Sequence, residues 1–318
     1  MADSTKPILI VRLGALGDII HALPAAASLK LSFHGRKLVW LAAPKWMPLF
    51  EGNPYLNSVI PFERNSVADL SATWRRLRAV KPGLAIDFQG LIQSAIAGRV
   101  AAPDEFVGLD GNLARERAAA YFYTKSVQAI GPHRVERCLQ LAAAAGATTF
   151  TDEAWLPEGR AEGDLPDAPF VLANPFAGWV SKQWPIEYYE RLAQTLRKEG
   201  LSLVVNVPES RALELAALKN LRVHSSSIAG LIYATRRAAA VVGVDSGPLH
   251  IAAALKRPGV AIYGPTDPAQ TGPFKSPMTV LRAATITTYK RENEIHPSMK
   301  AITPEQVAAA LRASIFIS

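Results

Sequence analysis

The chain has 318 residues, of which 49% are hydrophobic and 19% are charged, so we expect a folded protein of two domains rather than a disordered one. The formal net charge of +8 favours an anionic partner, such as a phosphorylated substrate or an anionic membrane surface. Nucleic acid is not expected as a partner, because the sequence has no zinc-finger spacing, no RNP-like motif and no long Lys/Arg run.

The sequence also bears on where the protein works. Cys138 is the single cysteine, so no intrachain disulfide can form, which fits a reducing compartment. Neither a secretion signal nor an apolar run of membrane-spanning length is visible; Asp18 and His21 interrupt the first candidate run. We therefore expect a cytoplasmic protein that can contact the inner face of a membrane as a peripheral protein.

Short apolar runs alternate with longer helical patterns along the chain. Continuous apolar strands are typical of parallel sheets that are buried on both faces, so the alternation predicts an α/β protein with doubly wound sheets. The predicted strands are Ile8–Val11, Leu38–Ala42, Ser58–Pro61, Leu84–Phe88, Phe170–Asn174, Leu203–Val207, Val241–Val244 and Val260–Tyr263. The predicted helices include Ile20–Lys30, Trp184–Lys198, Leu249–Leu255 and Thr303–Ser314.

A linker rich in proline, glycine and acidic residues, Leu156–Pro169, divides this series near its middle. The strand and helix series then restarts, which predicts two Rossmann-like domains that face a cleft, residues 1–160 and 161–302, followed by a C-terminal helix at 303–318. Ligands of open α/β sheets bind outside the carboxyl ends of the strands, so three strand ends are candidate sites.

The first strand end reads RLGALGDIIHALPA. Gly14 and Gly17 let the backbone turn closely, but this is not the G-x-G-x-x-G fingerprint of dinucleotide-binding proteins. Asp18 lies near a predicted helix start, where it can be a helix cap or a carboxylate that accepts a proton from an attacking hydroxyl. His21, one turn later, can orient this carboxylate or simply pack.

The middle strand end reads NPFAGWVSKQWP. Lys182 lies in this loop with no acidic neighbour, and it can be an ordinary solvated lysine or a phosphate ligand beside a helix start. Glu209, at the tip of the next strand, can bind ribose hydroxyls or merely begin a helix.

The third strand end reads VDSGPLH, where we expect a strand to end and a helix to begin near Asp245. The N–H groups of a helix start favour a phosphate, Ser246 adds a hydroxyl, and Gly247 lets a ligand approach the backbone. His250 lies one turn further on the same side and can donate to a phosphate oxygen, whereas Asp245 is expected to fix the turn or contact a sugar. A capped core helix is the alternative, but a second loop, YGPTDP, at the neighbouring strand end favours a diphosphate pocket.

These segments resemble the ADP-heptose:lipopolysaccharide heptosyltransferases, glycosyltransferase family 9, and the chain looks most like the heptosyltransferase I branch. The resemblance covers nearly the whole chain and rests on ILIVRLGALGDIIHALPA, DFQGLIQSA, ARERAAAYFY, HRVERC, SKQWP, VDSGPLHIAAAL and YGPTDP. It implies a GT-B fold with an N-terminal acceptor-binding domain, a C-terminal nucleotide-sugar-binding domain, and a last helix that packs back on the N-terminal domain.

The resemblance also implies roles for individual residues. Asp18 matches the general base, Lys182 the lysine on the donor phosphate, and Glu209 the ribose-binding glutamate. The segment that binds the ADP diphosphate matches Asp245, Ser246, Gly247 and His250, and the acceptor-side residues match Arg115, Arg137, Gly17 and Gln89. The implied reaction moves heptose from ADP-heptose to a Kdo–lipid A type acceptor with inversion at the anomeric carbon, in lipopolysaccharide inner-core synthesis. No cofactor is implied beyond the donor itself.

Some features keep other functions open. The family's basic cluster after the third strand is replaced by Pro61–Asn65, which contains one arginine, and the loop before Lys182 lacks the usual hydroxyls. A related glycosyltransferase with another donor or acceptor, and a non-catalytic sugar-nucleotide-binding protein, are the alternatives. No D-x-D motif or zinc-ligand spacing is present, so we expect metal independence. An NAD oxidoreductase or an epimerase is disfavoured by the missing dinucleotide fingerprint and, for the epimerase, by the absence of a Y-x-x-x-K pair.

Overall fold

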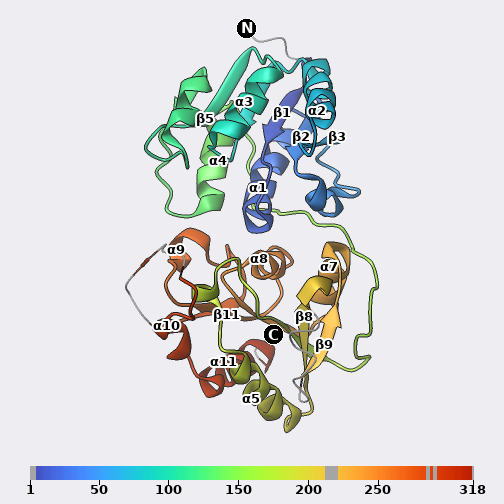
Figure 1. Cartoon of the computed structure of the whole chain (residues 1–318), viewed down its shortest axis with the longest axis vertical. Helices are drawn as coiled ribbons and strands as arrows, with labels where there is room; N and C mark the ends of the chain where they lie inside the picture. Colours follow the sequence, from blue (N-terminus) through green and yellow to red (C-terminus); the bar gives the residue numbers. More distant parts are fainter. Residues whose placement is uncertain (1–4, 212–220, 284–286, 289–291, 317–318) are drawn as a thin grey trace. The chain divides into compact units, whose positions relative to one another are not determined.

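The computed structural model describes residues 5–211, 221–283, 287–288 and 292–316. The chain divides into two compact units, Met1–Pro157 and Glu158–Ser318 (Figure 1). The division falls inside the linker at Leu156–Pro169, within a few residues of the boundary expected from the sequence. Each unit is a six-stranded parallel sheet with helices on its faces, so the prediction of doubly wound α/β sheets is confirmed.

The sheet of the first unit has the strand order β3-β2-β1-β4-β5-β6. Its strands are β1 (Ile8–Val11), β2 (Leu38–Ala42), β3 (Ser58–Pro61), β4 (Leu84–Asp87), β5 (Glu105–Leu109) and β6 (Lys125–Val127). The chain leaves β1 toward β2 on one side and later places β4 on the other side, with Val11 in register with Asp87. The carboxyl ends of β1 and β4 therefore form the switch point where ligands of such sheets bind.

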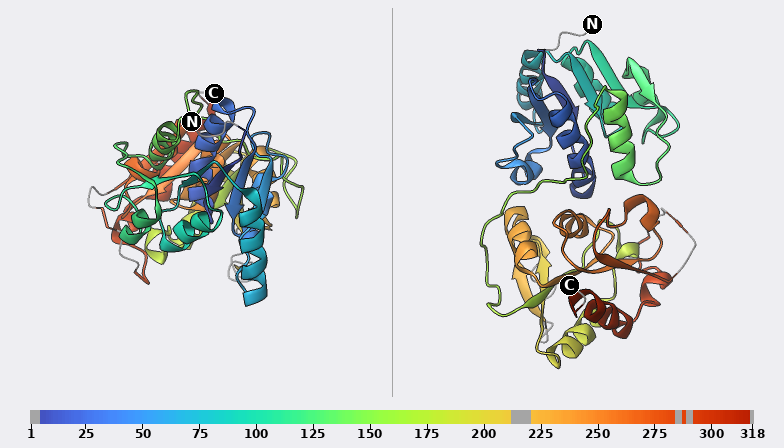
Figure 2. Two further views of the ribbon diagram at one scale, coloured as in Figure 1. Left: turned by 90° about the horizontal axis from the view of Figure 1, so that it is seen from above. Right: turned by 180° about the vertical axis from the view of Figure 1, so that it is seen from behind.

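Two pairs of helices cover this sheet. α1 (Leu16–Ser32) and α4 (Arg134–Ala144) pack side by side on one face, as the view from behind in Figure 2 shows. α2 (Val67–Val80) and α3 (Ile92–Val100) pack together and contact β3 and β4. Two 3₁₀ helices, η1 (Pro44–Phe50) and η2 (Arg117–Phe122), lie in the connections. β1, β2 and β4 are buried along their whole length, which explains their continuous apolar sequences.

The sheet of the second unit repeats this topology with the order β12-β11-β10-β7-β8-β9. Its strands are β7 (Phe170–Asn174), β8 (Ser202–Val207), β9 (Arg222–Ser225), β10 (Ala240–Val244), β11 (Gly259–Tyr263) and β12 (Met278–Arg282). Here the switch point lies between β7 and β10, where Asn174 is in register with Gly243. The carboxyl end of β10 leads directly into Asp245, so VDSGPLH lies at the expected position.

The helices of the second unit also form pairs. α7 (Ile228–Arg237) contacts α8 (Gly247–Ala254), and α5 (Ile186–Arg197) contacts α11 (Pro304–Phe316). Shorter helical turns occur at η3 (Val180–Lys182), η4 (Glu209–Arg211), α9 (Pro268–Thr271) and α10 (Pro297–Lys300).

The C-terminal helix belongs to the core of the second unit. α11 packs on α5 and β11, and Val307, Ala308 and Leu311 are fully buried there. The expectation that this helix also packs back on the N-terminal domain stays a prediction.

Candidate active site

Two hydrogen bonds tie the carboxyl ends of β1 and β4 together at the first switch point. Nη1 of Arg12 donates to the carbonyl oxygen of Phe88 over 2.5 Å, and the N–H of Leu13 donates to Oε1 of Gln89 over 2.7 Å. Gln89 is buried, and its own N–H donates to Oδ1 of Asp87. Gln89, predicted on the acceptor side, thus holds the floor of this site in place.

Asp18 lies in the first turn of α1, directly beside this switch point. The N–H of Ala15 donates to Oδ2 of Asp18 over 3.4 Å, so the carboxylate does cap the helix. The same Oδ2 lies 2.6 Å from Nη2 of Arg12 and 3.6 Å from Nη1 of Arg115, and Oδ1 forms an ion pair with Nη1 of Arg134. Cap and cationic cluster are therefore combined in one side chain.

The charge of Asp18 is strongly favoured by these partners. Burial by itself would raise the pKa of the Asp18 carboxyl, but the positive charges of Arg12, Arg134 and Arg115 outweigh burial, with a smaller contribution from His21. The net effect holds the pKa of Asp18 well below its usual range, so the carboxylate is ionised throughout the physiological pH range.

The three arginines come from three different segments. Arg12 directly follows β1, Arg134 begins α4, and Arg115 lies in the loop after β5. Gly90 allows this loop to approach, because its φ is +69° and a Cβ at Gly90 would lie 3.2 Å from the backbone N of Arg115. The N–H of Glu116 donates to the carbonyl oxygen of Gly90 over 2.9 Å and fixes the loop there.

The other residues predicted in this unit lie nearby but have different partners. Gly17 lies in the first turn of α1, next to Asp18. The ring of His21 packs edge-on against the ring of His133, with 5.5 Å between their centroids. Arg137, predicted on the acceptor side, donates through Nε to the carbonyl oxygen of Gly131 in the loop before α4.

A cavity of about 520 Å³ opens at the carboxyl edge of the first sheet. It is lined by Leu13, Gly14, Ala15, Ala43, Pro44, Lys45, Trp46, Phe62, Glu63, Arg64, Asn65, Gln89, Leu91, Gln93 and Arg115. Its lining carries three positive charges, from Lys45, Arg64 and Arg115, and one negative charge, from Glu63. Nζ of Lys45 lies 4.6 Å from the centre of the Trp46 ring, so a cation and an aromatic face lie together in the wall. The cavity suits an anionic ligand with an apolar side.

In the second unit, Asp245 is the centre of the VDSGPLH turn. Its Oδ2 lies 2.9 Å from Nζ of Lys182, and its Oδ1 lies 3.7 Å from Nε2 of His250 and 3.5 Å from the hydroxyl of Tyr263. Burial raises the pKa of Asp245, but Lys182 and His250 outweigh burial and lower it overall. Asp245 thus holds Lys182 and His250 at one strand end. Lys182 is further anchored by Trp179, whose ring centre is 4.9 Å from Nζ.

Several polar side chains around this turn are buried without a hydrogen-bond partner. Ser246 precedes α8, yet its hydroxyl makes no capping bond, and Oγ is shielded from solvent. The same is true of both amide atoms of Asn174 at the end of β7 and of Oγ of Ser181 in η3. Buried polar groups are normally satisfied, so unpartnered groups at the carboxyl ends of neighbouring strands mark a place where a polar ligand completes the structure.

Glu209 lies apart from this cluster. It is exposed and begins η4 at the tip of β8, next to β7 in the sheet. The guanidinium of Arg211, two residues later, lies over the ring of Phe176 at 3.5 Å from its centre. This corner presents a carboxylate next to a stacked cation and aromatic pair, which fits a nucleoside better than a phosphate.

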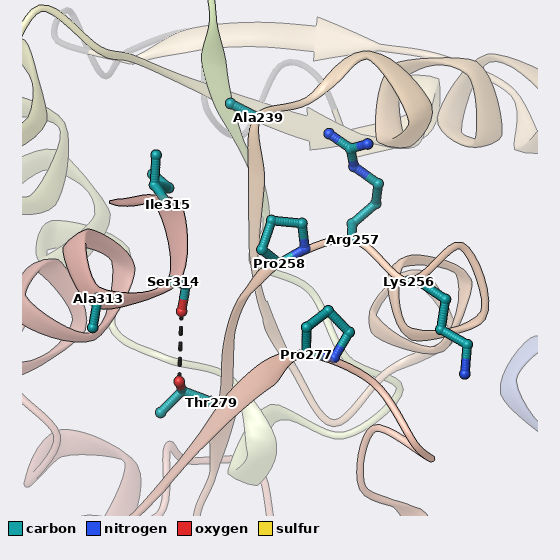
Figure 3. Close-up of a pocket in the computed structure, with 9 residues that line it drawn as sticks. All are labelled: Ala239, Lys256, Arg257, Pro258, Pro277, Thr279, Ala313, Ser314 and Ile315. Carbon is teal, nitrogen blue, oxygen red and sulfur yellow. Dashed lines mark hydrogen bonds between the residues drawn. The ribbon is translucent and has the colours of Figure 1, made fainter. Parts of the chain in front are cut away.

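A larger cavity of about 850 Å³ lies at the opposite edge of the second sheet (Figure 3). Its walls are formed by the segments that precede β10, β11 and β12 and by the end of α11, including Ala239, Arg257, Pro277 and Ser314. This is the amino edge of the sheet, and it contains none of the residues that the sequence singles out.

The structure thus gathers most of the predicted residues into one cluster in each unit, with Glu209 and Arg137 outside them. Asp18, Gly17, Gln89 and Arg115 lie together in the first unit, and Lys182, Asp245, Ser246, Gly247 and His250 in the second. Sequence reasoning missed Arg12 and Arg134, although both stand within the quoted motifs, because sequence does not show which arginines turn toward Asp18. Asn174 was also missed, although it ends a predicted strand.

Comparison with known proteins agrees with this picture. The model of glycosyltransferase family 9 (heptosyltransferase) matches residues 70–300. Lipopolysaccharide heptosyltransferase 1 of Pseudomonas aeruginosa is 33% identical over 290 residues, which are 84% of this chain and 81% of that protein. The Escherichia coli K12 protein of the same name is 28% identical over 93% of this chain and 97% of its own.

Solved structures extend the match to the fold. The E. coli heptosyltransferase WaaC with ADP has a TM-score of 0.77 and 25% identity, covering 97% of this chain and 99% of its own. The E. coli ADP-heptose lipopolysaccharide heptosyltransferase II has a TM-score of 0.80 and 23% identity, covering 98% of this chain and 99% of its own. The expected GT-B fold is confirmed. On the family match and the relative at 33% identity, the chain belongs to glycosyltransferase family 9, the heptosyltransferases.

Proposed function

We propose that this protein is an inverting glycosyltransferase that moves heptose from ADP-heptose to a Kdo–lipid A type acceptor in lipopolysaccharide inner-core synthesis. The observation that carries the proposal is the position of Asp18, a buried carboxylate at the β1–β4 switch point, next to a cationic cavity. Its relatives named lipopolysaccharide heptosyltransferase 1 support the assignment of donor and acceptor.

In the proposed reaction, Asp18 takes the proton of an acceptor hydroxyl while the oxygen of that hydroxyl attacks the anomeric carbon of the donor. The bond to ADP breaks at the same time, so the configuration inverts. The first unit binds the acceptor, with Arg115 and the cavity cations facing its anionic groups. Arg137 and Gly17 complete the acceptor side, next to the Asp18 carboxylate in the first turn of α1.

The second unit binds the donor. The N–H groups at the start of α8, the Ser246 hydroxyl, Lys182 and His250 meet the diphosphate, and Gly247 lets it approach the backbone. Negative charge grows on the diphosphate as ADP leaves, so these positioned donors stabilise the transition state more than the ground state. Glu209 binds the ribose hydroxyls.

We further infer that these donors carry the charge without a divalent ion. Transfer measured after treatment with EDTA should equal transfer in untreated enzyme. A loss of activity that added Mg²⁺ or Mn²⁺ restores would contradict this part of the proposal.

The acceptor also suggests a location. A net charge of +8 and a lipid-linked acceptor fit a cytoplasmic protein that attaches peripherally to the inner face of the inner membrane. Among the described residues, no helix is long and apolar enough to cross a membrane.

The decisive experiment is a donor and acceptor screen with purified protein. ADP release from ADP-heptose should depend on a Kdo–lipid A acceptor, and mass spectrometry should show the acceptor heavier by one heptose. ADP release with other acceptors, or from other nucleotide sugars, would redirect the proposal within the family. A non-catalytic binding protein would bind ADP and show no Asp18-dependent transfer in the same assay.

A further inference from the structure

The three arginines around Asp18 differ sharply in their exposure to solvent. The side chain of Arg12 is 6% exposed, that of Arg134 is 36% exposed and that of Arg115 is 48% exposed. Arg12 is also bound to the carbonyl oxygen of Phe88 at the switch point. Arg12 therefore cannot leave Asp18 without disturbing the sheet end, whereas Arg115 and Arg134 each keep part of their side chain in contact with solvent.

These ion pairs conflict with the role of a base. A carboxylate accepts a proton readily when its oxygens are free to meet the attacking hydroxyl, and it becomes a weak base when neighbouring cations stabilise its charge. In this structure Oδ1 is occupied by Arg134, and Oδ2 faces both Arg12 and Arg115. The geometry is that of a resting carboxylate.

We propose that Arg115 and Arg134 are positioning residues that hold Asp18 in ion pairs until an anionic group of the acceptor draws them away, while Arg12 stays bound and keeps the carboxylate oriented. This inference rests on the proposed function of Asp18 as the base. The acceptor would then prepare its own base, and Asp18 would remain weakly basic while the acceptor site is empty.

The cavity supplies the route for this exchange. Arg115 lines it together with Lys45 and Arg64, so a carboxylate or phosphate that enters the cavity finds Arg115 as one of three cations. An arginine that forms a paired, charge-assisted contact with the incoming anion cannot keep its full contact with Asp18. Arg134 pairs with the opposite oxygen, and its release opens Oδ1 to the attacking hydroxyl.

Other titratable groups also face Asp18 and must be separated from this effect. They are Arg12 after β1, His21 on α1, Arg115 in the loop after β5, and Arg134 and Cys138 on α4. His133 packs against His21, and Arg137 lies near Cys138. Burial raises the pKa of the Cys138 thiol to about 12, so this group stays neutral in the useful pH range. Because all of these groups act on the charge around Asp18, the readout has to follow the Asp18 carboxyl itself.

The test is ¹³C NMR of the Asp18 carboxyl in the full chain, labelled with ¹³C-aspartate and assigned with Asp18→Asn. In the free protein the signal should stay ionised down to the lowest pH at which the chain is folded. A saturating monomeric sugar carboxylate should move the pKa of Asp18 up far enough for its signal to titrate while the chain is still folded, and the methyl ester of the same sugar should not.

Variants separate the clamp, meaning the ion pairs of Arg115 and Arg134 with Asp18, from general effects on the fold. Arg115→Gln and Arg134→Gln should each raise the pKa of Asp18 in the free protein and reduce the response to the sugar carboxylate. Arg134→Lys, which keeps the positive charge, should largely restore both the low pKa and the response. Arg75→Gln, an exposed arginine on α2, should match the wild type. An Asp18 pKa that is unmoved in both glutamine variants, or by the carboxylate up to its solubility limit, would overturn the inference.

Kinetics give a second readout that a structural role would not change. In the wild type the acid limb of kcat should lie at higher pH than that of kcat/KM, because the former reports the complex and the latter the free enzyme. In Arg115→Gln and Arg134→Gln the two limbs should move together. If the NMR result holds but no heptose is transferred, the proposed function fails and the clamp stands. If transfer occurs with an unmoved Asp18 pKa, the clamp alone fails.

Discussion

Nζ of Lys182 lies 2.9 Å from Oδ2 of Asp245, and the two charges are held together at the end of β10. In the proposed donor site, the carboxylate does not meet the phosphate itself but fixes the position of the lysine that does. The ion pair is already formed in the structure without a donor.

This relationship predicts the effect of Lys182→Ala. We expect kcat to fall by a factor of about 10²–10³, as for the loss of one positioned charge donor to a transition state. The pKa of Asp245 should rise, because its largest favourable partner is removed while burial remains. Steady-state kinetics measures the fall in kcat, and ¹³C NMR of the labelled Asp245 carboxyl measures its pKa. Lys198→Ala, on an exposed lysine after α5, is the control, and normal turnover in Lys182→Ala would remove Lys182 from the reaction.

Asp18→Asn tests the base. Turnover should fall by a factor of about 10²–10⁴, the usual contribution of a positioned base. ADP affinity should be unchanged, because the residues that bind ADP in our proposal belong to the second unit. Calorimetry with ADP shows that the variant is folded, and rapid-quench assays measure transfer. Near-normal turnover would mean that another group accepts the proton.

The low pKa of Asp18 also predicts how stability changes with pH. A carboxylate whose pKa is lowered by folding stabilises the protein fully above its unfolded value of about 4, and this contribution is lost as the pH falls through the lower folded-state pKa. The difference in unfolding free energy between wild type and Asp18→Asn should therefore be largest at neutral pH and shrink below about pH 4. Urea unfolding at several pH values measures it, with exposed Asp167→Asn as the control that should show a small and constant difference.

Ser246 and Ser227 form a matched pair for the donor site. Both precede helices, but the Ser227 hydroxyl accepts from the N–H groups of Ala229 and Gly230, whereas the Ser246 hydroxyl makes no capping bond. Ser227→Ala should cost about 1 kcal/mol of stability. Ser246→Ala should leave the free protein nearly as stable, or slightly more so, because it removes a buried group without a partner.

For ADP affinity the order of the two serines should be reversed compared with stability, so that Ser246 matters and Ser227 does not. Ser246→Ala should weaken ADP binding about tenfold, and Ser227→Ala should leave it unchanged, because a hydrogen bond to a charged ligand is worth about 1.5–3 kcal/mol. Thermal melts with and without ADP report both quantities. A Ser246→Ala variant that loses stability but keeps its ADP affinity would show that the hydroxyl is structural.

Gly90→Ala probes the loop that carries Arg115. The backbone at Gly90 has φ of +69°, and a Cβ there would press on Ala114 and Arg115, so we expect a loss of about 1–3 kcal/mol in unfolding free energy. The KM for the acceptor should rise more than that for ADP-heptose. Equal changes in both KM values would indicate a general loss of structure.

The sequence predicted the fully buried strands well and also the edge strand β3, but it missed β5 and the edge strands β6, β9 and β12. β1, β2, β4, β7, β10 and β11 are buried along their whole length, and their continuous apolar runs predicted them to within one residue. β6, at one edge, has only three residues, Lys125–Val127, all at least partly exposed, and β9 contains Arg222 and His224. Edge positions bury one face or less, so their apolar signal is weak.

The candidate site shows a different limit. Asp18 and the VDSGPLH turn could be found because they follow predicted strands, and ligands of open α/β sheets bind at the carboxyl ends of strands. Arg134 lies 116 residues from Asp18 in the sequence, and its contact depends on how α4 packs along α1. The resemblance selected Arg137 and not Arg134, which lies one turn earlier on the same helix. In the structure it is Arg134 that pairs with Asp18, whereas Nε of Arg137 donates to the carbonyl oxygen of Gly131.

The repetition of one strand order in the two sheets has a practical consequence for engineering. Each unit closes its own core, and the chain passes from one to the other through a proline-rich stretch without helix or strand. Such modules tolerate recombination at the joint. A hybrid enzyme made by exchanging residues 1–157 with those of a family member of different acceptor preference should inherit the new acceptor while it retains the original nucleotide sugar.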